Sequence, residues 1–567
     1  MSITSIIIIS KNTLLIIVYT YTRVVKFTNL RNLSERAKDG TLLWLHVRGF
    51  IGATYELGQC YEHGLGVNKD IEKAEGYYRK AAKCGHIHAQ TRLELMQPSH
   101  YTAEQATQAE QKVRLGDTFS AFELYRFYRE SHLAKAIRFL KKAAQAGHEQ
   151  AMICLALHYK LGIGVRKQIA LYAEWLQKAA DNGSVYALYE LTQGYYMENE
   201  SEESCKIHID LLAKAANNGD CVAQCDMADG HDIAFNWFGY DYFGDCKYKD
   251  YEECLQASAN NGYLPAMSEL GTEYRGERYL KRLPKSAKYW IEKAAAAGYA
   301  DAQFELACMY NEGNCVQANT KLAFQYYKLA ADNSYADAQY PTAQFFKDGI
   351  PGVLEPDRQQ YLHYLQKAAE NESPEAQVEL SKLYEGSDLL ERNDELVIKW
   401  LTAPADGAFP VPLAQFNLGI KYRDGLHTPV DLKKAFKYLK LAADNNCEDA
   451  YCHLGAMYRR GDGTRVNYKK AFYYFQKATC AFAIAHVGCM FLRGYGVKRD
   501  IPQGVEHLQK AAKLNEPHAL YHLGECYENG WGLERNRRKA INCYRKAVKF
   551  DEDYDDATEA LKRLTKK

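Results

Sequence analysis

The feature that most constrains this chain is a recurring spacing of small, branched and aromatic residues. One copy carries Ala53, then Leu57 and Gly58, then Tyr61 and Gly64. The alanine, the leucine and the tyrosine are four residues apart and share one face of a helix, so the segment predicts an amphipathic helix. The same spacing returns in segments that begin at Ala302, Ala414, Ala450 and Ala519.

A second helical segment follows each first one. The stretches "KAEGYYRKAA" (73–82) and "KAFKYLKLAA" (434–443) each place two alanines seven residues apart, with aromatic residues between them. Other second segments end in Asn-Gly or Ala-Gly, as at 182–183 and 297–298, which suits the left-handed residue that closes a helix. Lys142, Lys178 and Lys214 recur at intervals of 36 residues. The pattern therefore predicts a repeat built from two helices.

The corner "GLGVNKD" (64–70) has two possible interpretations, a phosphate-binding loop or a turn between helices. A phosphate loop is usually unique in a domain and follows a strand. Here similar corners recur, as "GIGVRKQ" (162–168) and "GYGVKRD" (494–500), and they follow helices. Glycine permits the positive φ of a tight turn, and Asp70 and Asp500 are placed to cap the next helix. We interpret these corners as structural.

A glycine also recurs inside the first helix, where it costs about 1 kcal/mol relative to alanine in an isolated helix. Because the glycine occupies the same position of the first helix in these repeats, we predict that the paired helix approaches closely there. The 44 tyrosines are then expected to pack mainly between helices, with the hydroxyl at the edge. The glycines concerned are Gly58, Gly271, Gly419, Gly455 and Gly524.

Composition excludes several functional classes. The 567 residues include 72 basic and 71 acidic side chains, a balance that argues against binding nucleic acid. The 16 cysteines are irregularly placed and lack zinc-site spacing, so buried free thiols are expected, with some disulfides as the alternative. His518 and His522, at i,i+4 spacing, leave a fortuitous metal pair as a minor alternative. We predict no catalytic residue, no metal ligand and no cofactor.

Residues 1–33 form an apolar leader. Its longer uninterrupted run, residues 14–21, is far shorter than the roughly 20 residues of a spanning helix. A basic start and a small-residue cleavage site, both typical of a signal peptide, are missing. We expect a poorly ordered leader or a start codon placed too early, with a signal or anchor as the alternative. Membrane contact, if made, would involve only residues 1–22.

The pattern A-x-x-x-L-G-x-x-Y-x-x-G-x-G-V-x-x-D-x-x-K-A, closed by K-A-A-x-x-G, resembles the Sel1-like repeat, a relative of the tetratricopeptide repeat. The resemblance covers roughly residues 50–551, in about thirteen or fourteen units. It implies an all-α fold, an α-solenoid of antiparallel helix pairs that binds proteins on its concave face. We expect the solenoid to occupy residues 34–551 and a charged capping segment residues 552–567.

Some units depart from the pattern. The unit at 88–115 has Pro98 in place of its glycine corner, residues 202–216 lack the first-corner glycines, and the unit at 478–490 is about three residues short.

The resemblance implies a non-catalytic scaffold or adaptor for proteins. Alternatives from the same family are a cysteine-containing enzyme that hydrolyses β-lactams and a secreted, host-directed effector scaffold. Those enzyme relatives carry regular cysteine pairs, to which Cys480 and Cys489 are the nearest approach here. Scattered cysteines favour a reducing, cytoplasmic location. An envelope or secreted location is the alternative if the leader acts as a signal or anchor.

One insertion interrupts the repeat. Between Gly219 and Gly262 the period stretches to 43 residues, and the added material lies near 229–253. Insertions in a solenoid fall on a surface edge, where aromatic side chains either plug a neighbouring groove or contact a partner. Both interpretations stay open. The candidate partner-binding residues are Phe235, Trp237, Phe238, Tyr240 and Tyr242.

Overall fold

The computed structural model describes residues 40–198, 202–228, 246–248, 250–276, 280–407, 410–551 and 553–565. The expected leader therefore lies outside the described residues, as does most of the aromatic insertion. Within the described ranges the structure is α-helical, and an isolated bridge between Ile350 and Leu354 is the only β-type pairing. The predicted all-α fold is confirmed.

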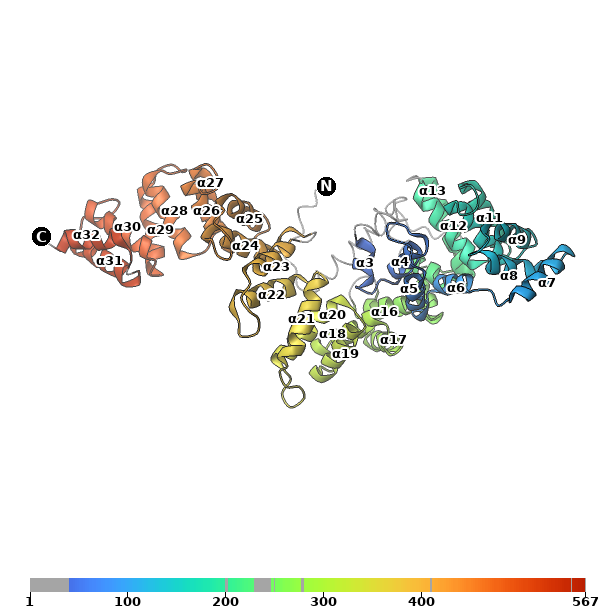
Figure 1. The fold of residues 1–567 in the computed structure, drawn as a ribbon. Coiled ribbons are helices and arrows are strands. Elements are labelled where there is room, and N and C mark those ends of the chain that lie inside the picture. Colours follow the sequence, from blue (N-terminus) through green and yellow to red (C-terminus); the bar gives the residue numbers. More distant parts are fainter. Residues whose placement is uncertain are drawn as a thin grey trace. The chain divides into compact units, whose positions relative to one another are not determined.

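Most helices form consecutive antiparallel pairs, each pair being one repeat (Figure 1). The unit with Pro98 departs from this arrangement, because its second helix packs against the helix that follows it. The short helix α3 (Thr41–His46) precedes the first pair. The unlabelled helical residues 221–228 stand between α13 and α15. The first helices of the pairs are α4 (Ile51–His63), α6 (Ile87–Met96), α8 (Phe119–Tyr128), α10 (Glu149–Leu161), α12 (Val185–Glu198), α16 (Leu264–Tyr274), α18 (Ala300–Glu312), α20 (Ala336–Asp348), α22 (Pro374–Gly386), α24 (Pro412–Asp424), α26 (Glu448–Arg460), α28 (Ala481–Arg493), α30 (Pro517–Asn529) and the terminal α32 (Asp555–Thr565).

The second helices alternate with these along the chain. They are α5 (Ile71–Lys83), α7 (Ala103–Arg114), α9 (Leu133–Gln145), α11 (Ile169–Asp181), α13 (Glu202–Asn217), α15 (Tyr251–Asn260), α17 (Pro284–Ala296), α19 (Thr320–Asp332), α21 (Arg358–Glu370), α23 (Asp394–Asp406), α25 (Leu432–Asp444), α27 (Tyr468–Lys477), α29 (Ile501–Lys513) and α31 (Arg537–Phe550). Helix α7 differs in packing against α8 and not against α6.

The corners between paired helices are structural, as predicted. Helix α4 ends at Gly64, whose φ of 70° is left-handed and therefore favours glycine. Six residues later the carboxylate of Asp70 accepts a hydrogen bond from the backbone N–H of Lys73 and caps α5. Asp500 caps α29 in the same way, through the N–H of Gln503. The corners thus end one helix and start the next.

Close approach at the internal glycines is also confirmed. A Cβ atom built at Gly58 would lie 2.5 Å from the ring of Tyr78 on α5, and one at Gly524 would lie 2.5 Å from the ring of Tyr544 on α31. Both tyrosine rings are fully buried. The glycine therefore makes room for a large side chain from the paired helix, and burial of that ring offsets the low helix propensity of glycine.

The chain divides into two compact units at Leu365, a position inside α21. The repeat pattern crosses this position without interruption, so the sequence provides no sign of the division. The described residues up to Tyr364 form one unit, and those from Leu365 onward form the other.

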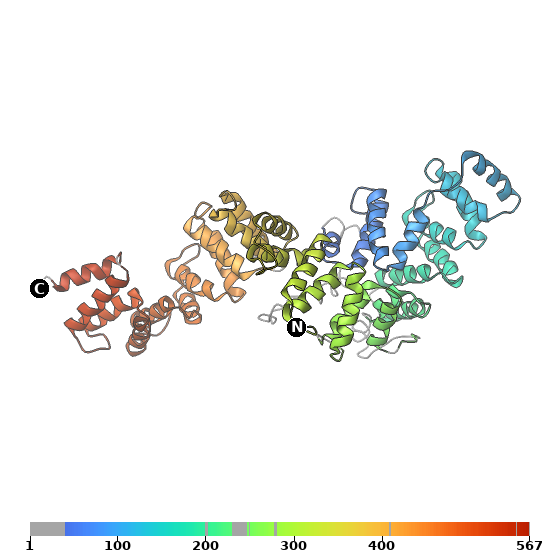
Figure 2. The ribbon, with the colours of Figure 1, turned by 90° about the horizontal axis from the view of Figure 1, so that it is seen from below.

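In the first of these units, early repeats contact repeats far along the chain. The N–H of Leu264 donates to the carbonyl of Cys84 at 3.0 Å, and the N–H of Ala336 donates to the carbonyl of Val47 at 2.7 Å. In both ribbon views the blue helices α4 and α5 accordingly lie beside green helices of the same unit, and Figure 1 shows α5 next to α16 (Figures 1 and 2). A strictly nearest-neighbour array would lack such contacts.

Within the described ranges, no helix combines the length and the apolar character that crossing a bilayer requires.

Candidate functional site

The first helices of three consecutive repeats border a surface hollow in the unit that begins at Leu365. The hollow has a volume of about 280 Å³. Half-buried Phe416 and Ile420 of α24 supply apolar surface, and exposed Lys382 of α22 stands at its rim. It is lined by Ser381, Lys382, Glu385, Leu401, Phe416, Asn417, Ile420, Lys421, Arg423, Leu426 and His453.

Most charges in this hollow are already paired. Lys421 forms an ion pair with Glu385, and the guanidinium of Arg423 bonds to both Asp424 and the Nδ1 of His453. Burial lowers the pKa of His453, and the neighbouring Arg423 lowers it further, so its imidazole is neutral at neutral pH. The arrangement can accept an apolar side chain beside a rim of charged groups.

A second hollow, of about 210 Å³, adjoins a histidine and cysteine cluster between α28 and α30. One ligand atom each from Cys489, His518 and His522 lies within 4.8 Å of the others. His486, one turn before Cys489, places its ring 4.6 Å from that of His518. These donor types are common ligands of zinc and other transition metals.

Burial dominates the titration of this cluster. It lowers the pKa of His486 to about 2 and that of His518 to about 3, with further lowering from neighbouring imidazoles and from Arg459. The same burial raises the pKa of the Cys489 thiol. The two imidazoles are therefore neutral over the physiological range, the form in which histidine binds metals.

Sequence reasoning considered His518 and His522 but missed the other members of the cluster. The missed pattern is a histidine directly before the Leu-Gly or Val-Gly pair in three successive first helices, at His453, His486 and His522. Positions of equal phase in neighbouring repeats lie side by side, so this pattern could have indicated the cluster. Cys480 and Cys489, the nearest approach to a cysteine pair in the sequence, do not pair. The thiol of Cys480 instead contacts that of Cys452.

The five aromatic residues proposed from the insertion cannot be assigned a place in the site. Phe235, Trp237, Phe238, Tyr240 and Tyr242 all lie outside the described residues. Whether they plug a groove or bind a partner stays a prediction.

A buried polar network in the other unit was also missed. Arg92 of α6 pairs with Glu62 of α4, and Tyr78 donates to the same carboxylate at 2.7 Å. Tyr186 of α12 donates to Glu190 at 3.0 Å, and its hydroxyl lies 3.4 Å from that of Tyr55.

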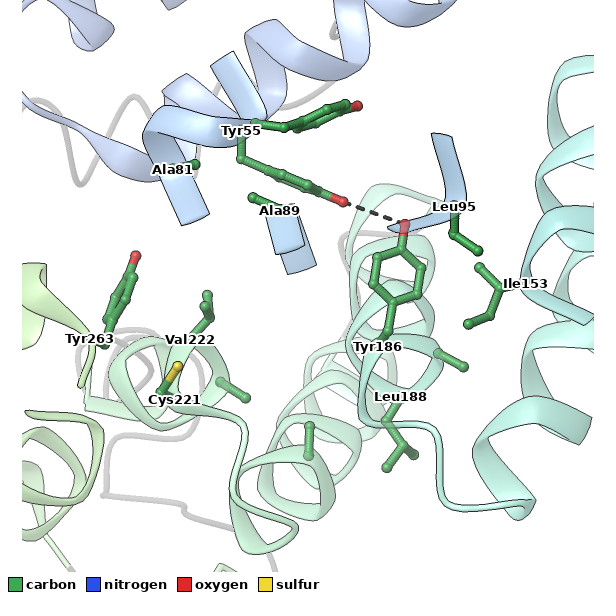
Figure 3. Packing of buried hydrophobic residues seen from close by; sticks show 14 of the residues in the cluster. Tyr55, Ala81, Ala89, Leu95, Ile153, Tyr186, Leu188, Cys221, Val222 and Tyr263 are labelled. Carbon is green, nitrogen blue, oxygen red and sulfur yellow. Dashed lines mark hydrogen bonds between the residues drawn. The ribbon is translucent and has the colours of Figure 1, made fainter. Parts of the chain in front are cut away.

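Figure 3 shows Tyr55 and Tyr186 meeting inside a core that also receives Val222 and Tyr263 from later repeats. The two tyrosines are almost fully buried. The network therefore joins distant repeats, and its role is structural.

Comparison with known proteins agrees with this architecture. The matches to the Sel1 repeat cover residues 51–86, 133–148, 150–184, 264–299, 300–335, 336–373, 374–403, 412–447, 448–481, 481–516 and 517–549. The uncharacterized protein NMB1327 of Neisseria meningitidis is 31% identical over 115 residues, which are 19% of this chain and 24% of that protein. The chain thus covers about a quarter of that relative's length.

Two solved structures are also similar. The protective antigen c5321 of uropathogenic Escherichia coli, which displays the SLR fold, is 24% identical with a TM-score of 0.50, over 81% of this chain and 97% of that one. A Sel1 repeat protein of Oxalobacter formigenes is 25% identical with a TM-score of 0.37, over 55% of this chain and 90% of that one. The first likeness supports the fold alone. With paired helices, glycine corners and family matches over more than half of its length, the chain belongs to the Sel1 repeat family.

Proposed function

We propose that this Sel1 repeat protein is a non-catalytic scaffold that binds other proteins through the face formed by its first helices. The hollow bordered by α22, α24 and α26 is the observation that carries the proposal. It exposes part of Phe416 and Ile420 between consecutive repeats and leaves room for an inserted side chain. Interfaces are commonly anchored by an apolar or aromatic group that enters such a hollow, with polar groups around it.

The charges around the hollow indicate which kind of protein segment it can bind. Lys421 is balanced by Glu385, whereas Lys382 projects from the rim. We infer a protein segment with an apolar or aromatic anchor and an acidic neighbour. The irregular cysteine positions support a reducing compartment, and we place the scaffold in the cytoplasm.

The test fills the hollow without changing a charge. Asn417 is a half-buried residue of its lining, and Asn417→Trp should block the entry of an anchor side chain. Gln476→Trp, on the exposed surface of α27, is the matched control, because it also leaves the charge unchanged. Tagged full-length variants are used for affinity capture from the native organism, and each captured protein is then purified and its binding measured directly.

We expect at least one purified partner to bind wild type and Gln476→Trp equally and to lose about tenfold or more in affinity for Asn417→Trp, equivalent to one lost interface contact of about 1.4 kcal/mol. Circular dichroism should show equal helicity in the three proteins. Partners that bind Asn417→Trp as well as wild type would contradict the role of the hollow. Turnover of the β-lactam nitrocefin above background would contradict the non-catalytic assignment.

A further inference from the structure

We propose that His486, Cys489, His518 and His522 form a zinc site between α28 and α30. The proposal is independent of the protein-binding role. Cys489 and both α30 histidines already hold their ligand atoms within 4.8 Å of one another. The two α28 residues are three positions apart and the two α30 residues are four apart, so each pair shares one helix face.

Hydrogen bonds orient both α30 imidazoles. The Nδ1 atom of His518 lies 2.8 Å from the hydroxyl of Tyr554, and the Nδ1 atom of His522 lies 2.5 Å from a carboxylate oxygen of Glu525. Each Nδ1 is engaged, so Nε2 is the atom left for a metal. A histidine that binds a metal usually has its other ring nitrogen held in this way, often by a carboxylate.

His486 adds an independent observation. It is 2% exposed, and within the described part of the chain its Nε2 is buried without a hydrogen-bond partner. A buried polar atom without a partner costs free energy and calls for an explanation. Its ring already stacks 4.8 Å from Phe475 and lies against His518. Coordination to a metal held by the other three ligands would satisfy this nitrogen.

The donor set favours zinc over calcium or magnesium. Three imidazoles and a thiolate make a tetrahedral site of the kind that zinc occupies, whereas calcium and magnesium select oxygen ligands. Tetrahedral zinc would draw the ligand atoms closer together, to about 2.0–2.3 Å from the ion. Coordination also deprotonates a thiol. The hollow of about 210 Å³ reaches Cys489 and His522 and provides a path for entry.

Some nearby charges lower the affinity of the site for zinc, and others raise it. Arg459 and Arg493 lie close enough to act on these imidazoles and disfavour a bound cation. The thiolate of Cys489 and the carboxylate of Glu525 compensate for them. Loss of the carboxylate should therefore weaken zinc without removing a ligand.

The first measurement uses the full-length wild-type protein. After removal of metal with a chelator, the protein is titrated with Co²⁺, whose absorption spectrum depends on its ligands and coordination geometry. We expect one Co²⁺ per chain, with visible absorption of tetrahedral intensity and a thiolate-to-cobalt band in the near ultraviolet. Zn²⁺ should displace the Co²⁺ and raise the thermal midpoint of unfolding, because it binds the folded state.

Variants then assign the ligands. Cys489→Ser should abolish the thiolate band, His486→Ala should weaken zinc binding, and Glu525→Gln should weaken it by about 10- to 100-fold while keeping the band. Cys526→Ser, at a buried cysteine one turn after His522, and His507→Gln on α29 are the matched controls and should bind as wild type does. Helicity of every variant is checked by circular dichroism.

The proposal is overturned if metal-free wild-type protein takes up no Co²⁺ or Zn²⁺ at micromolar concentration. It is also overturned if the thiolate band survives Cys489→Ser in a folded protein, or if Cys526→Ser removes the band. Unchanged zinc affinity in folded His486→Ala would refute the four-ligand set. The wild-type titration decides the first point even if a variant fails to fold.

Discussion

At the scale of single residues, the glycines of the first helices set how closely each helix pair packs. Gly58 faces the Tyr78 ring, Gly419 faces Leu439 and Gly455 faces Phe475, in each case a side chain of the paired second helix. A larger residue at these positions has to displace a buried side chain. Gly76, in contrast, lies on the exposed side of α5, with no atom near the position of a Cβ.

Substitution by alanine should change the free energy of unfolding in opposite directions at Gly58 and Gly76. Gly58→Ala is expected to lower the free energy of unfolding by about 1–3 kcal/mol, because overpacking outweighs the gain in helix propensity. Gly76→Ala should raise it by about 0.5–1 kcal/mol. Hydrogen exchange of peptides from α4 and α5 measures both effects. Equal stabilisation by the two substitutions would show that Tyr78 yields easily.

At the scale of elements, a buried network of charges and tyrosines fastens α4, α6 and α12 together. Burial alone would raise the pKa of Glu190, but Lys160, Arg92 and the hydroxyl of Tyr186 outweigh it and lower that pKa. Burial likewise acts on Glu62, where Arg92 and His63 lower the pKa overall. Both carboxylates are therefore charged in the folded protein at neutral pH.

The network predicts that this unit loses stability in acid in two stages. Burial lowers the pKa of His46 and of His63 from 6.5 to about 4, so the unfolded chain binds their protons more tightly and stability falls as the pH drops below 6.5. Glu62 and Glu190 have lowered folded pKa values. Their contribution is complete above about 4.5 and is lost as the pH falls through those values.

Local unfolding free energies of α4, α6 and α12, measured by hydrogen exchange between pH 7 and pH 4 with correction for the intrinsic rate, check this prediction. Glu190→Gln should destabilise these helices by about 1–3 kcal/mol at pH 7 and reduce the loss below pH 4.5. Glu72→Gln, an exposed control on α5, should change neither the stability at pH 7 nor the loss of stability below pH 4.5. A stability that is constant from pH 7 to pH 4 would contradict the assigned pKa directions.

At the scale of the whole molecule, contacts between distant repeats change how the first unit unfolds. His88 lies 3.0 Å from Asp220, and Arg48 lies 3.5 Å from Asp337, each pair joining repeats far apart in the sequence. In a linear array each repeat is stabilised mainly by its two neighbours. The unit up to Tyr364 should therefore unfold more cooperatively than the unit that follows it.

Two glycines at one repeat position test this contact. Gly85 and Gly147 both follow a second helix with positive φ, 83° and 88°. A Cβ at Gly85 would collide with the carbonyl oxygen of Gly262, whereas one at Gly147 would meet no atom. Gly85→Ala should therefore cost about 1–3 kcal/mol more than Gly147→Ala and increase hydrogen exchange near Gly262. Equal costs would indicate that the distant contact contributes no stability.

The sequence by itself determined the repeat, its helix pairs and its corners. These features are local: i,i+4 spacing defines a helix face, a left-handed corner needs Gly64, and a carboxylate or amide such as Asp70 or Asn467 caps the next helix. The close approach at Gly58 was predictable for the same reason, because the paired helix follows directly in the chain.

Only the tertiary structure decided the division at Leu365 and the contact of Gly85 with Gly262. Small rotations between successive repeats accumulate along the array, and residue spacing within one repeat does not encode their sum. The cluster of Cys489 and His518 was determined partly by the sequence and partly by the tertiary structure. Its members sit on neighbouring first helices, so periodic alignment brings them near each other, but side-chain packing alone sets their atoms within 4.8 Å.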